Sequence, residues 1–119
     1  MNITKHFTFE DIKCPCCDAL KIIPALYRHL ELLEQLQDRL KYPIIILSGY
    51  RCVRYNAQHG GSPRSWHLVF ATDIKPAVIF SDTMRQLRIK AYEVGFTGVG
   101  IGEDYIHLDL RPEPLIWRI

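Results

Sequence analysis

Two polar stretches of this sequence contain side chains that could bind a transition metal. The first holds His67 and Asp73, and the second holds Asp104 and His107. Zinc readily takes imidazole nitrogen and carboxylate oxygen as ligands, and a catalytic zinc keeps one position open for water. We therefore take His67, Asp73 and His107 as candidate ligands of one Zn²⁺ per chain. Hydrolysis is the chemistry that such a site would perform.

The clearest support comes from a predicted strand over residues 105–110. Successive side chains of a strand point to opposite faces. One face is apolar and belongs to the core, and the other gathers hydroxyl, imidazole, carboxylate and guanidinium groups: Tyr105, His107, Asp109 and Arg111. Such a set favours a functional face. For this strand alone, the alternative is a solvated outer surface.

His67 and Asp73 can share a metal only if the chain turns between them. Six residues of straight strand would separate them by about 20 Å, and on a helix they would point about 240° apart. A turn must therefore intervene. The alternative is that His67 is a surface residue that follows the Gly-Gly-Ser-Pro loop of residues 60–63.

Hydrophobic periodicity and capping patterns predict the elements that must position these groups. A short helical turn with a capping box of Thr8 and Asp11 comes first. The other predicted elements are a helix from Pro24 to about Leu40, a buried strand over 44–47, a helical turn over 53–58, a strand over 71–75, a helix that has Ser81 as its N-cap and runs to Val94, where Gly95 stops it, and the strand over 105–110. Helices and strands mix without regular βαβ alternation. We therefore expect an α+β domain whose small, largely antiparallel sheet is flanked by helices.

The composition is that of an ordinary globular domain. With 119 residues, 48% of them hydrophobic and 24% charged, the chain is predicted to form one domain, residues 1–119. A formal charge of +2 disfavours a nucleic-acid partner and weakly favours an anionic target such as the cell wall. No apolar run approaches the ~20 residues of a transmembrane segment. Residues 1–6 lack the apolar core of a signal peptide, so we expect synthesis in the cytoplasm without one.

The four cysteines, Cys14, Cys16, Cys17 and Cys52, allow several interpretations. The first three could form a redox or metal-binding pair of the C-x-x-C type. A second C-x-x-C pair is absent, which disfavours a zinc finger, and no strand is predicted before the cluster as in thioredoxin-like motifs. We favour reduced, structural cysteines. A structural metal or a bridge to Cys52 stays open.

Several short motifs follow one another in a fixed order: residues 48–52 (Ser-Gly-Tyr-Arg-Cys), Asn56, 60–67 (Gly-Gly-Ser-Pro-Arg-Ser-Trp-His), 71–74 (Ala-Thr-Asp-Ile), 98–100 (Gly-Val-Gly) and 107–111 (His-Leu-Asp-Leu-Arg). Together they resemble the zinc D-Ala-D-Ala carboxypeptidases and the related murein L,D-endopeptidases of bacteria and phages. The resemblance runs from Phe7 to Trp117. It implies the Hedgehog/DD-peptidase fold.

The resemblance also implies catalytic roles for individual residues. The zinc ligands of the family fall on His67, Asp73 and His107. The general base of the family, an acid three residues before the last ligand, falls on Asp104. The arginine that lies near the metal and steadies the substrate carbonyl or carboxylate falls on Arg51.

Three further residues are implied to assist the site. Ser65 would hydrogen-bond the substrate, and Asp109 and Arg111 would support the metal ligands from behind. One feature departs from the family pattern, which has one more residue and a glycine between the first two ligands. Here the spacing from His67 to Asp73 is six residues, and no glycine lies between them. Because a missing residue shifts strand parity, the turn must be rebuilt if Asp73 is to face the metal.

The implied function is a zinc metallopeptidase that hydrolyses peptidoglycan stem peptides, as a D-Ala-D-Ala carboxypeptidase or a murein endopeptidase. Endolysin-like phage enzymes belong to the same group. We expect a monomer whose partner is the peptide substrate and whose site of action is the cell wall or periplasm. Two alternatives stay open: a metal- or partner-binding module of the same fold without turnover, and a thiol protein built on Cys14 and Cys17.

Overall fold

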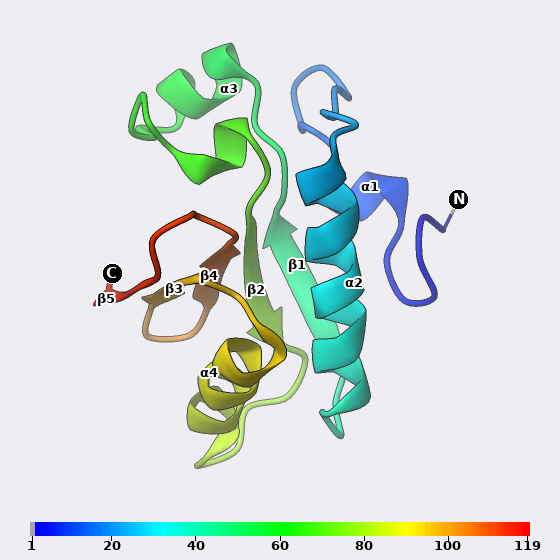
Figure 1. Ribbon diagram of the computed structural model, residues 1–119, viewed down its shortest axis with the longest axis vertical. Coiled ribbons are helices and arrows are strands. Elements are labelled where there is room, and N and C mark those ends of the chain that lie inside the picture. The colour runs from blue at the N-terminus through cyan, green and yellow to red at the C-terminus, as the bar shows by residue number, and fades with distance from the viewer. Residues whose placement is uncertain (1) are drawn as a thin grey trace.

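The computed structural model of the chain describes residues 2–119. Its helices are α1 (Phe9–Ile12), α2 (Pro24–Asp38), α3 (Val53–Gln58) and α4 (Thr83–Val94), together with the 3₁₀ helix η1 (Trp66–Leu68). Its strands are β1 (Ile44–Ser48), β2 (Thr72–Pro76), β3 (Gly98–Ile101), β4 (Ile106–Asp109) and β5 (Leu115–Arg118). Figure 1 shows α3 beyond the end of β1 and shows the long helix α2 running beside that strand.

Within the described residues the strands form a five-stranded sheet in the order β1-β2-β4-β3-β5. β1 pairs with β2, β2 with β4 and β4 with β3 in antiparallel fashion, whereas β3 and β5 are parallel. The predicted α+β class is confirmed. The sheet is largely antiparallel, as predicted, but its β5 edge makes it mixed.

The sequence pattern does not predict β3 or β5. β3 contains Gly98 and Gly100, a residue type that is depleted in strands. β5 follows Pro112 and Pro114 and is mostly exposed, so it lacks the alternation of a half-buried strand. Pairing with neighbouring strands, rather than local propensity, places both segments in the sheet.

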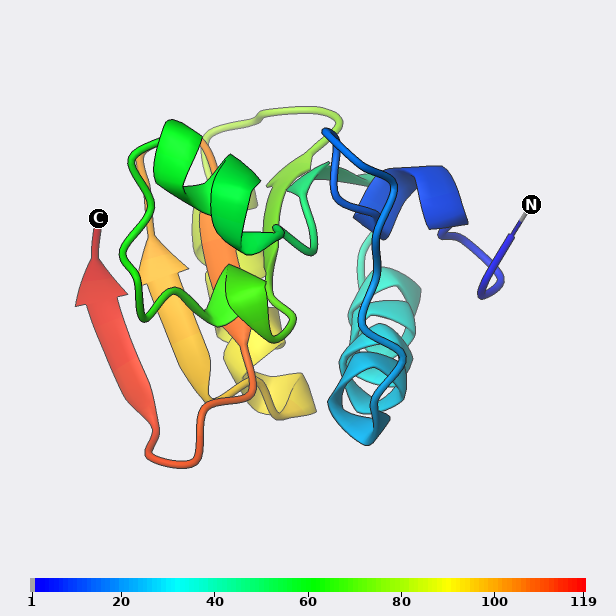
Figure 2. The same cartoon turned by 90° about the horizontal axis from the view of Figure 1, so that it is seen from above.

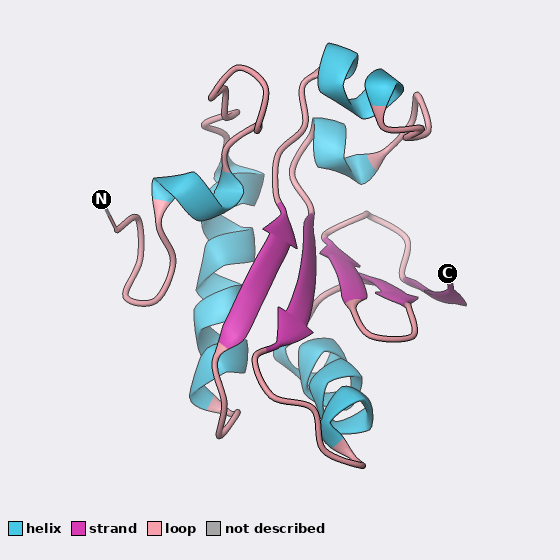
Figure 3. Cartoon of the chain, turned by 180° about the vertical axis from the view of Figure 1, so that it is seen from behind, coloured by secondary structure: helices cyan, strands magenta, loops and turns pink. Residues whose placement is uncertain are grey.

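α2 and α4 pack against the same face of the sheet and lie behind the strands in Figure 3. The apolar layer between them comes from leucines at helical spacing and from alternate strand positions: Leu26, Leu30, Leu33, Leu36 and Leu87 from the helices, and Ile74, Ile106 and Leu108 from the strands. Because strand side chains alternate, Asp73 and His107 point to the opposite face. The candidate ligands therefore lie on the side of the sheet away from these two helices.

Local capping explains where several helices begin and end. The side chain of Thr8 accepts a hydrogen bond from the backbone N–H of Asp11, whose carboxylate accepts one in return, so the predicted capping box is confirmed. α4 begins at Thr83 with Asp82 as its N-cap, one residue later than the predicted N-cap Ser81. It ends at Gly95, whose φ of 120° suits glycine. None of the helices within residues 2–119 has the length and apolar character needed to cross a bilayer.

A close approach of two backbones ties α1 to the chain after β1, near the upper edge of the view in Figure 2. The backbone N–H of Tyr50 donates to the carbonyl oxygen of Ile12 at 2.9 Å. A Cβ on Gly49 would lie only 2.6 Å from the same oxygen. Glycine is therefore required at this position. The loop that follows β1 is held by the N-terminal segment.

Candidate metal centre

His67 lies in η1, a single 3₁₀ turn that follows the glycine-rich loop. The Oγ of Ser65 caps this turn by accepting a hydrogen bond from the His67 backbone N–H at 3.2 Å. The ring Nδ1 of His67 lies 2.7 Å from the carbonyl oxygen of Gly49. Since a carbonyl oxygen only accepts, Nδ1 donates this hydrogen bond, and Nε2 is the nitrogen that faces Asp73. The imidazole is thereby oriented to bind a metal through Nε2.

Asp73 joins the two histidines. It lies on β2, directly opposite His107 on β4. Its Oδ1 lies 3.2 Å from Nε2 of His67 and 3.0 Å from Nδ1 of His107. These distances are close to the roughly 3.4 Å that separates ligand atoms in a tetrahedral zinc site with bonds of about 2.1 Å. All three prospective ligand atoms lie within 4.8 Å of one another.

The shortened connection between His67 and Asp73 closes without glycine. η1 supplies the turn, and Phe70 turns inward, where it is buried with its ring centroid 4.7 Å from that of His29. Thr72, at the start of β2, faces the helices and its Oγ1 lies 2.9 Å from Nε2 of His29. Strand alternation then puts Asp73 on the other face, beside His107.

Behind His107 stands a buried carboxylate with its own cation. Nε2 of His107 lies 2.8 Å from Oδ2 of Asp109, which is fully buried. The guanidinium of Arg111 donates to both oxygens of Asp109, at 2.9 and 2.7 Å. A histidine that binds a metal commonly holds its second nitrogen on such a carboxylate. This arrangement rules out the solvated outer face considered for β4.

The electrostatics of this cluster favour ionised carboxylates. Burial opposes ionisation of Asp73, but hydrogen bonds with His107 and His67 outweigh it and hold the pKa of Asp73 well below its ordinary value. Burial also opposes ionisation of Asp109, and its bonds with Arg111 and His107 likewise keep its pKa low. Burial lowers the pKa of His107, but its bonds with the two carboxylates outweigh this and raise it. Both carboxylates are therefore ionised, and Asp73 offers a negatively charged oxygen between the two histidines.

Arg51 reaches the same cluster from the loop after β1. Its Nη2 lies 3.8 Å from Oδ2 of Asp73, and its Nε donates to Oγ of Ser48 at 3.1 Å. The backbone N–H of Arg51 donates to the carbonyl oxygen of His67 at 2.9 Å. The guanidinium is thus held beside the candidate ligand Asp73.

Asp104 is not part of the cluster that His67, Asp73 and His107 form. It lies in the turn between β3 and β4, is exposed, and makes no hydrogen bond or ion pair with the residues from 2 to 119. Its neighbour Tyr105 links it electrostatically to the site. Burial raises the pKa of Tyr105, and the carboxylates of Asp73 and Asp104 raise it further, while Arg51 opposes them.

Trp117 lies beside the site, and the motifs do not predict it. His107 pairs with Gly100 on β3, and Gly100 pairs with Trp117 on β5. A Cβ on Gly100 would lie 2.8 Å from Cζ2 of Trp117, so the missing side chain makes room for the indole. The Trp117 and His107 ring centroids are 5.4 Å apart. The alternation of glycines in β3 is the one sequence signal for this space.

A shallow hollow of about 320 Å³ lies beside the two histidines. Aromatic and basic side chains dominate its walls: Ser62, Arg64, Ser65, Trp66, His67, His107, Arg111 and Trp117 line it. The Cζ atom of Arg111 lies 4.5 Å from the ring centroid of Trp117 and 5.9 Å from that of Trp66. The hollow gives the candidate ligands access to a bound molecule.

A family model described as Peptidase M15 matches residues 5–109. This chain belongs to the peptidase M15 family. The match confirms the resemblance to zinc DD-peptidases that the motifs indicate. Among curated proteins, no match to the sequence was found. The segment matched to M15 contains the three candidate ligands, whereas β5 and Trp117 lie beyond it.

Membership of the M15 family supports a peptidase, and the family depends on zinc. The donor set of this chain fits that metal. It offers two imidazole nitrogens and one carboxylate oxygen, and catalytic zinc sites typically use three protein ligands and an open position. Nε2 of His67 is made available by the bond of Nδ1 to Gly49. Both candidate histidine ligands line the hollow.

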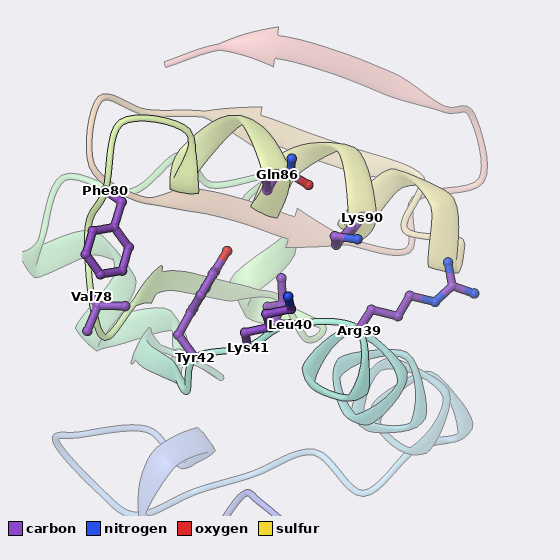
Figure 4. Close-up of a pocket in the computed structure, with 8 residues that line it drawn as sticks. All are labelled: Arg39, Leu40, Lys41, Tyr42, Val78, Phe80, Gln86 and Lys90. Carbon is purple, nitrogen blue, oxygen red and sulfur yellow. The ribbon is translucent and has the colours of Figure 1, made fainter.

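A second hollow, of about 440 Å³, lies away from this M15 centre (Figure 4). It lies between the segment that follows α2 and the start of α4, and its lining mixes apolar and basic side chains: Arg39, Leu40, Lys41, Tyr42, Val78, Phe80, Gln86 and Lys90. It includes neither histidine nor carboxylate. None of the candidate ligands lines this second hollow.

Proposed function

We propose that this protein is a zinc metallopeptidase that hydrolyses amide bonds in the stem peptides of peptidoglycan. The observation that carries the proposal is the convergence of His67, Asp73 and His107 in a chain of the M15 family. We propose further that residues 1–119 act as one monomeric domain with the Hedgehog/DD-peptidase fold, and that the cell wall is the site of action.

Zinc held by these three side chains would supply a bound water of lowered pKa and a Lewis acid for the scissile carbonyl. Two neutral imidazoles and one carboxylate carry a single negative charge, so the loaded site would keep a net positive charge. Such a site is electrophilic, as amide hydrolysis requires. The bonds of His67 to Gly49 and of His107 to Asp109 would keep both rings in place during turnover.

Asp104 would transfer the proton, and Arg51 would stabilise the negative charge that develops on the substrate. Asp104 would accept a proton from the attacking water and pass it to the leaving amine. Its exposed position in the β3–β4 turn leaves its carboxylate without a protein partner among the described residues, so it is free to meet the substrate. Arg51, held by Ser48 near Asp73, would offer its guanidinium to the carbonyl oxygen as negative charge develops there.

The hollow supports a peptide that carries a carboxylate. Arg64 lines it, and a guanidinium binds a carboxylate through two parallel hydrogen bonds. Trp66 and Trp117 offer apolar surface for short side chains such as that of alanine. Ser65, which caps η1, also lines the hollow, where its oxygen would meet the substrate backbone. A D-Ala-D-Ala terminus or an internal stem-peptide bond satisfies these requirements.

The test is hydrolysis of a soluble stem peptide ending in D-Ala-D-Ala and of intact murein by the purified protein. Amine release, free D-alanine and zinc content are measured in the wild type, in Asp104→Asn and in the matched control Glu103→Gln, which changes the neighbouring exposed acid. We expect zinc-dependent hydrolysis that falls about 100-fold or more in Asp104→Asn and persists in Glu103→Gln. Zinc content should be equal in all three proteins.

The products would also identify the bond. Free D-alanine without other fragments indicates a carboxypeptidase, and new internal amines indicate an endopeptidase. If the zinc-loaded wild type releases no amine from either substrate, the protein is not a peptidase of stem peptides. Retained binding of murein by both the wild type and Asp104→Asn would then identify the binding module without turnover.

A further inference from the structure

A second cluster of metal-binding side chains lies outside the proposed active site. The fold brings the thiols of Cys14, Cys16, Cys17 and Cys52 together, with all four sulfur atoms within 4.8 Å of one another. Sγ of Cys16 lies 3.7 Å from that of Cys14 and 3.4 Å from that of Cys52. All four cysteines are free thiols. The four thiols thus bring together two segments that are distant in sequence, the one with Cys14, Cys16 and Cys17 and the one with Cys52.

The spacing fits a tetrahedral metal. Zinc–thiolate bonds of about 2.3 Å place neighbouring sulfurs roughly 3.8 Å apart. The short sulfur–sulfur distances of this cluster, 3.7 and 3.4 Å, are close to that value. A set of four sulfurs is typical of zinc or of iron. The spacing of the cysteines in the sequence does not reveal this cluster. Cys52 joins the other three cysteines through tertiary contact and not as part of a second C-x-x-C motif.

Hydrogen-bond donors surround the sulfurs as they do around thiolates. The backbone N–H of Cys52 donates to Sγ of Cys14 at 3.4 Å, and that of Tyr55 donates to Sγ of Cys52 at 3.3 Å. Nη2 of Arg54 donates to Sγ of Cys16 at 3.6 Å. Backbone N–H groups and a guanidinium stabilise negative charge on sulfur. These donors would stabilise thiolates once a metal has displaced the thiol protons.

We propose that Cys14, Cys16, Cys17 and Cys52 bind a structural zinc ion, separate from the proposed catalytic one. Binding would release the protons that the four thiols still carry and leave a complex of charge −2, with the Arg54 guanidinium beside it. Four protein ligands leave no open position, so this zinc performs no chemistry.

The ion would clamp the N-terminal segment to the loop that orients the active site. Cys14 follows α1, and Cys52 follows Arg51 and caps α3. The same two segments meet through Tyr50 and Ile12. Gly49, whose carbonyl orients His67, lies in this loop. The cysteine site therefore stabilises the surroundings of the histidine site without touching a substrate.

Metal content tests this proposal with variants of both clusters. Protein purified under reducing conditions should contain about two zinc ions per chain. His67→Ala should lose one of them and Cys16→Ser the other, whereas the matched loop control Ala19→Ser should keep both. If the histidine site binds no zinc, the wild type holds about one ion, which is lost in Cys16→Ser and kept in His67→Ala. Failure of the proposed function is thus distinguishable from failure of this inference.

Two measurements on the wild type itself guard against a variant that does not fold. Cobalt substitution should produce thiolate-to-cobalt charge-transfer bands, which persist in His67→Ala. Alkylation should modify the four thiols of the native protein only after a chelator is added. The proposal is overturned by iron in place of zinc, by an intact mass that reveals a disulfide, or by thiols that react equally with and without chelator.

Discussion

The His67–Asp73–His107 cluster and the cysteine cluster could each bind a metal ion, but they differ in the elements that carry the ligands and in the ligands themselves. The histidine cluster is built across the sheet, from two paired strands and a short turn, and opens on a hollow. The cysteine cluster joins two loops and has exposed members, Cys16 and Cys17. The first uses ligands of low total charge, and the second would use four thiolates. A metal bound by the first stays electrophilic and accessible, whereas a metal bound by the second is saturated and inert.

The difference shows what each scaffold provides. Strand pairing fixes Asp73 opposite His107, and buried partners such as Asp109 hold the rings, so this site has a preformed geometry. The cysteines lie on loops, which backbone hydrogen bonds such as that from Tyr50 to Ile12 hold together. We therefore expect substitutions at the first cluster to affect hydrolysis and substitutions at the second to affect stability.

The largest effect is expected for Asp73→Asn. The amide loses the charge that joins the two histidines, and a metal centre supplies several kcal/mol to the transition state. Since about 1.4 kcal/mol is tenfold in rate, hydrolysis should fall about 1000-fold or more. The cysteine site should keep its zinc. Rates and zinc content are measured beside Asp82→Asn, a conservative change at an exposed position. Unchanged hydrolysis would remove Asp73 from the site.

Gly49→Ala should weaken both clusters at once. The new Cβ would lie 2.6 Å from the carbonyl oxygen of Ile12, so the loop must shift, at a cost of about 1–3 kcal/mol in the free energy of unfolding. That loop carries the carbonyl that orients His67, and Cys52 lies in it too. Denaturant unfolding and zinc content measure the effect.

Gly60→Ala is the control for this substitution. Gly60 has a φ of 71°, and a Cβ added there would have no other atom within 4 Å, so alanine meets strain without a clash. It should lower stability by only about 1 kcal/mol and leave both metals in place. Equal effects at the two glycines would contradict the coupling of the clusters through the Gly49 loop.

Asp109→Asn should weaken the first cluster alone. Loss of the buried carboxylate behind a metal-binding histidine typically lowers metal affinity about 10- to 100-fold. Competition with a chelator should show this loss for one zinc and no change for the thiolate-bound one. Glu113→Gln, at an exposed position nearby in the chain, is the control. A loss at both sites would mean that the clusters are not independent.

The smallest effect concerns the core behind the histidine cluster. His29 is completely buried, and burial lowers its pKa from 6.5 to about 3. At pH values between these two pKa values, His29 binds a proton in the unfolded chain but not in the folded chain. The free energy of unfolding therefore falls as the pH drops. The loss should be about 1 kcal/mol between about pH 6 and about pH 5.

His29→Gln should remove this part of the acid sensitivity, because glutamine does not titrate. The free energy of unfolding is measured against pH in chelator, so that metal release does not contribute. His59→Gln, at an exposed position, is the matched control. If His29→Gln and the wild type lose stability equally over this range, His29 does not cause the acid sensitivity.

Much of the first cluster is predictable from the sequence because its information is local. Alternation along β4 places His107 and Asp109 on one face, and the motifs identify His67 and Asp73. The Thr8 capping box is equally local. These features need only the period of a strand or the first turn of a helix.

The remaining features depend on contacts between distant segments. β3 is too rich in glycine to be predicted as a strand, and it forms because β4 and β5 pair with it. Cys52 meets the other cysteines only because the backbones of Gly49 and Ile12 approach closely. The ring of Trp117 lies near that of His107 because Gly100 has no Cβ to occupy the space that the indole fills. No spacing rule along the chain encodes such encounters.

The parallel pairing of β5 with β3 makes strand register a means of changing selectivity. Trp117 lies beside His107 only because it pairs with Gly100. A one-residue insertion or deletion in the connection before β5 would bring Ile116 or Arg118 to that position and turn the neighbouring side chains to the other face. The three proposed ligands, which come from other elements, would stay where they are. A change of loop length would therefore exchange the wall of the hollow and leave the proposed catalytic residues in place.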